Sequence, residues 1–213
     1  MKLRMLSFGA ALMLVVSAAV AVADVIEYKI DPVHSLVGFN VRHFFTRVPG
    51  RFKDYTGTIT FDEKDMAKSS VNVTIQAASI DTENERRDNH LRSGDFFLVD
   101  SFPTITFKST KIVPGPDNGA LVYGDLTIRG ITKPVTLDAK YLGSMADSRM
   151  GRKIAGFEGY VTINRKEFNI LYNRTLDQGG LMLGDDVNIV LQVEANWTDP
   201  NAPRPPQPQG EKK

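Results

Sequence analysis

The residues able to do acid–base, nucleophilic or metal chemistry are few, and they gather in two short stretches. The first holds Asp31, His34 and Ser35 in the sequence D-P-V-H-S, which are the residue types of a nucleophilic triad. Neighbours on a strand point to opposite faces, so the Ser35 hydroxyl is poorly placed to bond the His34 imidazole. Asp31 and Pro32 are typical of a turn that enters a strand. We therefore expect a capping or strand-edge role here rather than catalysis.

The second stretch is R-D-N-H, with Arg87, Asp88 and His90. Its charges fit the solvated face of a helix with local ion pairs. The same cluster stands beside apolar residues, and it would also serve as a polar rim that holds the head of an amphiphile. A third hypothesis makes the chain a lipid-modifying enzyme, with His43 or His90 as general base near Asp88.

Composition excludes several other chemistries. The chain has no Cys and only 3 His, which removes thiol nucleophiles, disulfides and cysteine-based zinc sites. His34 and His43 lie an odd number of positions apart, so on one regular strand they face opposite ways. Lys plus Arg is 26 and Asp plus Glu is 25, with no basic excess for a nucleic-acid backbone. We expect no metal, no cofactor and no nucleic-acid partner.

The two ends of the chain differ from its body. Residues 1–23 have a basic start, a short apolar run and the small-residue site Ala21-Val22-Ala23, the pattern of a cleaved secretory signal. We expect an exported soluble protein without a stable membrane anchor after cleavage. Residues 199–213 are rich in Pro and Gln and lack apolar periodicity, which predicts a disordered tail.

Residues 24–198 form the body, where apolar and polar residues alternate with the period of a strand. The clearest runs cover 36–43, 55–61, 71–76, 104–108, 135–141, 157–163 and 187–194. Turn signals separate them, among them Pro116-Asp117-Asn118-Gly119 and the break from Arg129 to Pro134. The pattern predicts an all-β fold of roughly eight to ten antiparallel strands, as a sandwich or barrel.

One segment, Ser79 to Pro103, is too long and too charged for a hairpin loop. We predict a short helix over residues 83–93, started by a capping box at Thr82 to Glu85 and ended by Gly94 in the left-handed conformation. An insert of this kind commonly covers one end of a barrel or lines its mouth. The inward aromatic residues would then either fill the barrel or leave room for one small ligand, and the residues alone favour neither.

Eight ordered motifs give a more specific indication. They are D-P-V-H-S at 31–35, V-R-H at 41–43, A-S-I-D-T at 78–82, R-D-N-H-L at 87–91, D-F-F at 95–97, S-F-P-T-I-T-F at 101–107, G-D-L-T-I-R-G-I-T-K-P-V at 124–135 and I-N-R-K-E-F at 163–168. In order and spacing the chain resembles the YceI-like family of exported, lipocalin-like proteins. The resemblance implies an extended antiparallel lipocalin-like barrel with an apolar tunnel and with the short helical insert near one end. It also implies a long isoprenoid lipid as ligand, and it leaves a homodimer open.

Our leading hypothesis is therefore a periplasmic protein that binds a polyprenyl compound or an isoprenoid quinone in the barrel, for transport or storage. The predicted ligand-binding residues are Phe39, Val41, His43, Phe52, Ile59, Phe61, Val73, Ile75, Arg87, Asp88, His90, Phe107, Leu126, Ile128, Phe157 and Val161. The four polar members are chosen because they match family motifs. The alternatives are the lipid-modifying enzyme and a solid core whose exterior or tail is an interaction surface.

Overall fold

Strands make up most of the computed structural model, which describes residues 25–147, 151–174 and 182–198. The predicted signal segment 1–23 and tail 199–213 lie outside the described residues. The strands are β1 (Ile26–Ile30), β2 (Leu36–His43), β3 (Thr46–Phe52), β4 (Tyr55–Phe61), β5 (Ser70–Gln76), β6 (Ile80–Asp81), β7 (Thr104–Pro114), β8 (Gly119–Ile128), β9 (Ile131–Asp147), β10 (Arg152–Asn164) and β11 (Leu183–Thr198). The helices are η1 (Met66–Lys68), η2 (Ala77–Ser79), α1 (Glu85–Arg92) and η3 (Arg165–Phe168).

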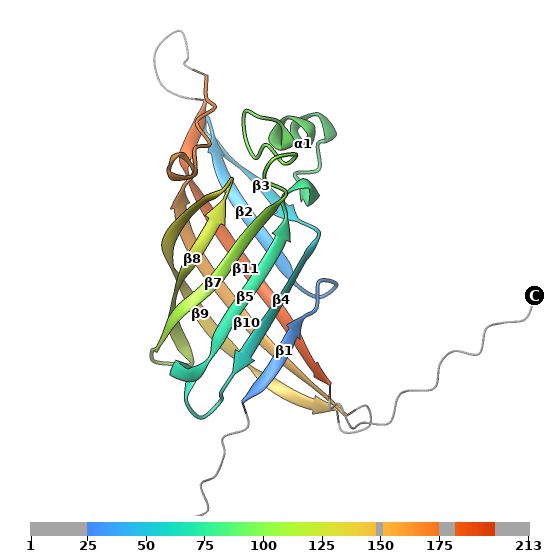
Figure 1. Ribbon diagram of the computed structural model, residues 1–213, viewed down its shortest axis with the longest axis vertical. Coiled ribbons are helices and arrows are strands. Elements are labelled where there is room, and N and C mark those ends of the chain that lie inside the picture. Colours follow the sequence, from blue (N-terminus) through green and yellow to red (C-terminus); the bar gives the residue numbers. More distant parts are fainter. Residues whose placement is uncertain (1–24, 148–150, 175–181, 199–213) are drawn as a thin grey trace, which may run out of the picture.

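Eight antiparallel strands close into a barrel in the order β1-β4-β5-β7-β8-β9-β10-β11, and β1 returns to β11 (Figure 1). β1 pairs with β11 at Ala195 and Asn196, whereas β2 takes the same edge of β11 from Leu183 to Gln192. β3 then pairs with β2, and β6 with β3. The predicted all-β antiparallel barrel is confirmed, and its closure leaves the main strands without free edges.

The alternation of the sequence places apolar residues inside the barrel and polar residues outside it. Val161 of β10 and Ile189 of β11 are paired and both face the interior. Tyr160, the neighbour of Val161, points outward and is 45% exposed. This follows from the two-residue period of a strand, which makes the inward and outward sets predictable from the sequence.

Two predicted turns are confirmed by their backbone geometry. Asp117 and Asn118, between β7 and β8, have φ of 53° and 61°. Arg129 and Gly130, between β8 and β9, have φ of 50° and 72°. Asn, Asp and Gly tolerate this left-handed region, which tight hairpin loops require.

The predicted helix is present, but both of its predicted ends are wrong. Asn84 is the N-cap of α1, and its side chain accepts a hydrogen bond from the Arg87 N–H. Thr82 cannot cap the helix because its hydroxyl bonds the buried Asp88 instead. At the other end the helix stops at Ser93, which has an extended backbone and donates its hydroxyl to the His90 carbonyl, so no left-handed glycine is used.

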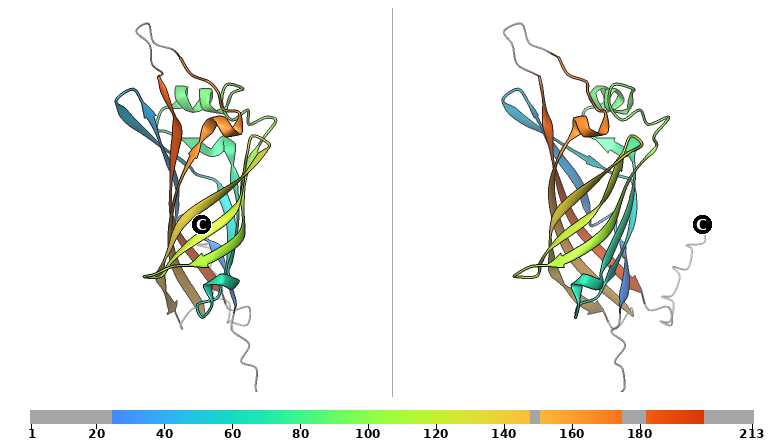
Figure 2. Two further views of the ribbon diagram at one scale, coloured as in Figure 1. Left: turned by 90° about the vertical axis from the view of Figure 1, so that its left-hand side faces the viewer. Right: turned by 60° about the vertical axis from the view of Figure 1, so that its left-hand side comes forward.

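The barrel has two unlike ends, which we call the α1 end and the far end. α1, η3 and the β2–β3 hairpin all lie at the α1 end, while η1 and the start of β1 lie at the far end (Figures 1 and 2). The insert therefore covers one end of the barrel, as predicted. No helix within the described residues combines the length and the apolar character needed to cross a membrane.

Candidate functional site

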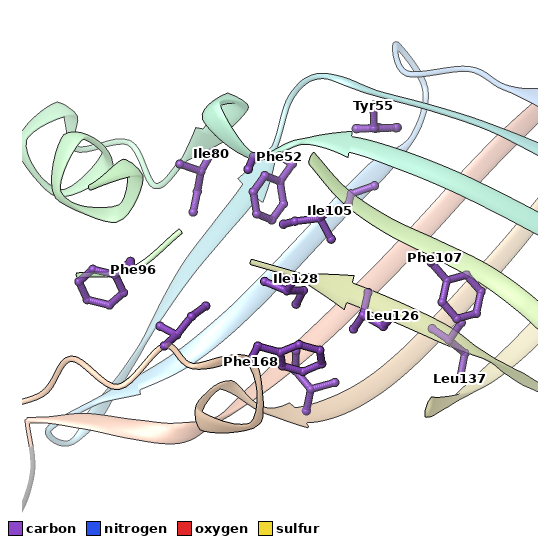
Figure 3. Packing of buried hydrophobic residues seen from close by; sticks show 14 of the residues in the cluster. Phe52, Tyr55, Ile80, Phe96, Ile105, Phe107, Leu126, Ile128, Leu137 and Phe168 are labelled. Atoms are coloured by element: carbon purple, nitrogen blue, oxygen red, sulfur yellow. The ribbon is translucent and has the colours of Figure 1, made fainter. Parts of the chain in front are cut away.

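A cavity of about 720 Å³ lies inside the barrel. It falls in the range of roughly 300–1,000 Å³ typical of small-molecule sites. Side chains that point inward from β2, β4, β5, β7, β8, β9, β10 and β11 form its walls, and nearly all of them are apolar. Figure 3 shows how Phe107, Leu126 and Leu137 lie along the bore, while Phe96 and Ile80 lie toward α1.

The polar groups that line the cavity gather at the α1 end. They are His43, Thr82, Asn84, Arg86, Arg87, His90, Arg165 and the hydroxyl-bearing Tyr172. The described residues that line the cavity include no carboxylate. The cavity thus combines an apolar bore with a basic mouth, an arrangement that suits a ligand with a long apolar tail and a polar head.

Hydrogen bonds within the insert hold α1 over this mouth. Asp88 is only 6% exposed and accepts hydrogen bonds from both the N–H and the hydroxyl of Thr82. The Arg87 guanidinium donates to the Thr82 hydroxyl and to the Thr82 carbonyl, both at 2.7 Å. Arg92 ties the last turn of α1 to the Ala78 and Ile80 carbonyls at 2.7 and 2.9 Å.

His90 belongs to an aromatic corner of the same mouth. Its ring packs edge-on against Phe96 and Tyr172, with centroids 5.1 and 4.9 Å away. Its Nε2 lies 2.7 Å from an Asp95 carboxylate oxygen. The partners of Asp88 are on Thr82, so the geometry does not form the His–Asp88 pair that the enzyme hypothesis requires.

Arg165 is buried, and the protein holds its guanidinium through several carbonyls and one carboxylate. It donates to the carbonyls of Gly184, Ile170 and Tyr172 and forms an ion pair with Asp185. Burial lowers the pKa of Arg165, opposed by the nearby carboxylate of Asp185. These bonds fix the segment after η3 against β11, and they define one side of the mouth.

Aromatic side chains close the bore at the far end. The rings of Phe61, Tyr141 and Phe157 contact one another with centroid distances of 4.6, 5.3 and 5.5 Å. Tyr28 packs in the same cluster. Its pKa is raised to about 12, mainly by burial and to a lesser extent by the nearby negative charge of Glu63. These four residues, which we call the aromatic plug, do not line the cavity. The bore is therefore a blind pocket that opens at the α1 end.

The D-P-V-H-S stretch forms a turn on the outside of the barrel. Asp31 accepts from the Val33 N–H at 2.9 Å and lies 3.0 Å from the His34 ring nitrogen. Ser35 bonds the backbone of Glu194 instead of His34. The geometry thus matches the predicted strand-edge role. Asp31, His34 and Glu194 are also the one group of potential metal ligands within the described residues. Two of these three residues, Asp31 and His34, are already hydrogen-bonded to each other.

Comparisons with known proteins agree with this architecture. The model of the YceI-like domain matches residues 28–195. Protein YceI of Salmonella arizonae is 41% identical over 197 residues, which cover 91% of this chain and 97% of the relative.

This chain belongs to the YceI-like family. Among solved structures, YceI of Campylobacter jejuni is 34% identical, covers 74% of this chain and 90% of its own, and superposes with a TM-score of 0.65. BcnA of Burkholderia cenocepacia is 26% identical, and the match covers 78% of this chain and 99% of BcnA with a TM-score of 0.68. A polyisoprenoid-binding domain of Saccharophagus degradans has the same fold at 16% identity, with a TM-score of 0.59 and coverage of 84% and 99%.

Thirteen of the sixteen predicted ligand-binding residues line the cavity of this YceI-like barrel. They are Phe39, Val41, His43, Phe52, Ile59, Val73, Ile75, Arg87, His90, Phe107, Leu126, Ile128 and Val161. The other three are placed elsewhere. Phe61 and Phe157 face inward as predicted but lie too near the far end, in the aromatic plug. Asp88 points into the insert, where Thr82 satisfies its carboxylate.

Several residues of the mouth were not predicted. Asn84 and Arg86 shortly precede Arg87 in the sequence, so the charged run itself was the available signal. Tyr172 and Ile170 follow η3 in a segment without strand alternation, and nothing local indicates that they return to the mouth. Arg165 stands in the motif I-N-R-K-E-F, but a motif does not show that its guanidinium is buried.

Proposed function

We propose that this protein is an exported, periplasmic carrier that holds the tail of a long isoprenoid lipid in its barrel. The ligand would be a polyprenyl compound or an isoprenoid quinone, with its head group at the basic mouth near Arg86, Arg87 and His90. The protein would bind and transfer or store the lipid without converting it. The Saccharophagus degradans neighbour, a polyisoprenoid-binding domain of the same fold, supports this choice of ligand.

One observation carries the proposal: the barrel encloses a blind, apolar bore whose polar groups all lie at its open end. A barrel of eight strands is just wide enough to be filled by its own side chains or to hold one small ligand. Here the side chains leave about 720 Å³ free. A cavity with walls this apolar favours an apolar guest over water.

The energetics suit a hydrocarbon tail. Each buried CH₂ group gains about 0.8 kcal/mol relative to water. The net affinity is smaller because association and ordering oppose it, and large ligands reach about 0.3 kcal/mol per heavy atom. An apolar bore discriminates weakly between similar tails, so bulk and length are the properties that it reads.

Filling the bore tests the proposal. Val161→Trp places an indole in the cavity from the middle of β10, and we expect it to weaken binding of a fluorescent polyprenyl lipid by at least tenfold. Tyr160→Trp adds an indole at the adjacent outward position, which is 45% exposed, and should bind as the wild type does. Fluorescence titration measures both affinities, and thermal melts verify that both variants fold.

A second measurement identifies the natural ligand. Protein isolated without detergent should release a long isoprenoid compound into organic solvent, detected by mass spectrometry.

Equal binding by Val161→Trp and Tyr160→Trp would place the ligand outside the bore. Repeated isolation of empty protein that also refuses added polyprenyl lipid and quinone would overturn the proposal.

A further inference from the structure

Two phenylalanines project from the rim of the cavity mouth into solvent. Phe44 and Phe45 form the two-residue loop between β2 and β3, and they are 42% and 93% exposed. The strands behind them are part of the cavity, because Val41, His43 and Val48 line it. The hairpin extends outward at the α1 end of the barrel (Figure 2).

The backbone of this loop is strained. Phe44 has a φ of 49°, in the left-handed region that glycine adopts freely and that bulky side chains rarely enter. Asp117, Asn118 and Asn169, whose types tolerate this region, also have positive φ, and so do Glu83, Leu98 and Arg129. Since the ring of Phe45 is almost wholly in water, packing within the barrel does not explain an aromatic pair at this position.

The hairpin is also basic. From residue 42 to residue 53 the sequence contains Arg42, Arg47, Arg51 and Lys53 and no acidic residue. Arg51 and Lys53, near the base of the hairpin, pair with Asp81. Arg42 and Arg47 flank the two phenylalanines, and the Arg42 guanidinium donates to the Phe45 carbonyl at 3.0 Å. The tip therefore presents apolar rings between two cations.

We propose that the Phe44–Phe45 tip docks the barrel on the surface of an anionic lipid bilayer. Aromatic side chains enter the headgroup region, and flanking cations attract anionic lipids. Docked in this way, the mouth faces the membrane, and a tail enters or leaves the bore without crossing water. This inference rests on the proposed lipid cargo for its purpose, but docking itself is measured without cargo.

Vesicle co-sedimentation tests the docking surface. We expect cargo-free protein to bind vesicles of phosphatidylglycerol and phosphatidylethanolamine, more weakly at high salt and more weakly still with phosphatidylcholine alone. Phe45→Ser removes an exposed ring and should lower partitioning about tenfold while the melting temperature stays the same. Arg47→Gln should reduce binding to the anionic vesicles and abolish most of its salt dependence.

The matched control is Leu142→Ser, which removes another apolar side chain, 59% exposed, from β9. It should leave vesicle binding unchanged. Phe44→Gly relieves the backbone strain, so it should melt at the same or a higher temperature and yet bind vesicles less. The proposal is overturned if wild-type protein ignores anionic vesicles, if Leu142→Ser weakens binding as much as Phe45→Ser, or if the tip proves to hold a dimer that Phe45→Ser dissociates.

Fluorescence tests the orientation and separates docking from cargo binding. Trp197 is the single Trp of the chain and packs in the cluster at the far end. In vesicles with brominated acyl chains, the indole introduced by Phe45→Trp should be quenched, while Trp197 in the wild type should not. Phe45→Ser should still take up polyprenyl lipid from solution, because Phe45 does not line the cavity. Quenching of Phe45→Trp in a protein that takes up no lipid would refute the carrier function and leave the docking proposal standing. Quenching of Trp197 in the wild type would refute the docking proposal.

Discussion

At the scale of single residues, the Asp31–His34 pair shows how a short motif fixes local structure. The hydrogen bond that the His34 ring donates to the Asp31 carboxylate is the main cause that raises the pKa of His34 above 6.5, and Glu194 adds to it while Arg152 opposes it. The hydrogen bond from His34 is the main cause that lowers the pKa of Asp31 below 3.8. The pair closes the turn between β1 and β2, and the His34 ring also lies near Glu194 of β11.

These shifts predict a pH-dependent contribution to stability. The raised pKa of His34 stabilises the fold fully below its unfolded value near 6.5, and this contribution disappears as the pH rises through the folded pKa. The lowered pKa of Asp31 contributes above 3.8 and is lost as the pH falls through its folded value. His34→Gln should therefore cost most stability at about pH 5 and little at about pH 9, as measured by urea unfolding.

The partner variant provides the control for this prediction. Asp31→Asn should show at least as large a loss at about pH 5, because Asp31 also accepts from Asn196, and the double variant should lose less than the sum of the two single losses. An equal effect of His34→Gln at both pH values would show that the pair contributes nothing through its charge. Residue roles of this kind were predictable, because D-P-V-H-S acts over a few positions of one turn.

At the scale of elements, strand alternation predicted which side chains face inward, because a strand permits only two faces. The helix was predicted less well. Thr82 and Asn84 are both good N-caps, and the choice between them depends on Asp88, whose carboxylate takes the Thr82 hydroxyl. A carboxylate in a charged run usually faces solvent, so nothing in the sequence indicates that this one is buried.

Asp88 is therefore predicted to be an anchor for α1 rather than a head-group contact. Asp88→Ala leaves the Thr82 N–H and hydroxyl without their buried acceptor, which should lower the free energy of unfolding by about 1–3 kcal/mol. Because α1 covers the mouth, the variant should also release bound lipid faster. Urea unfolding and stopped-flow displacement of a fluorescent polyprenyl lipid measure the two effects.

Glu85→Ala is the control on the same helix. Glu85 is exposed in the first turn, where its interaction with the helix dipole is worth less than about 1 kcal/mol. It should leave both the stability and the release rate nearly unchanged. Release as slow in Asp88→Ala as in the wild type would show that α1 does not control access to the bore.

At the scale of the whole molecule, the height of a side chain along the barrel decides its role. Phe61 and Phe107 both face inward, but Phe107 lines the cavity and Phe61 belongs to the aromatic plug. Alternation fixes the face of a residue and not its height, which depends on how all the strands are staggered around the barrel. The all-β fold and most of the lining could thus be predicted, whereas the blind end of the bore could not.

The aromatic plug sets the depth of the bore and should set the length of tail that it accepts. Phe157→Ala removes one ring from the inner side of the plug and extends the cavity toward the far end, at a cost in stability of up to about 3 kcal/mol. Its preference among polyprenols of increasing length, measured by competition binding, should move to longer chains. Tyr141→Phe keeps the ring and loses only the hydrogen bond to Glu63, so its preference should remain that of the wild type. If Phe157→Ala folds, as judged by its melting curve, and still prefers the wild-type length, then the plug does not measure the tail, and the ligand must be selected at the basic mouth.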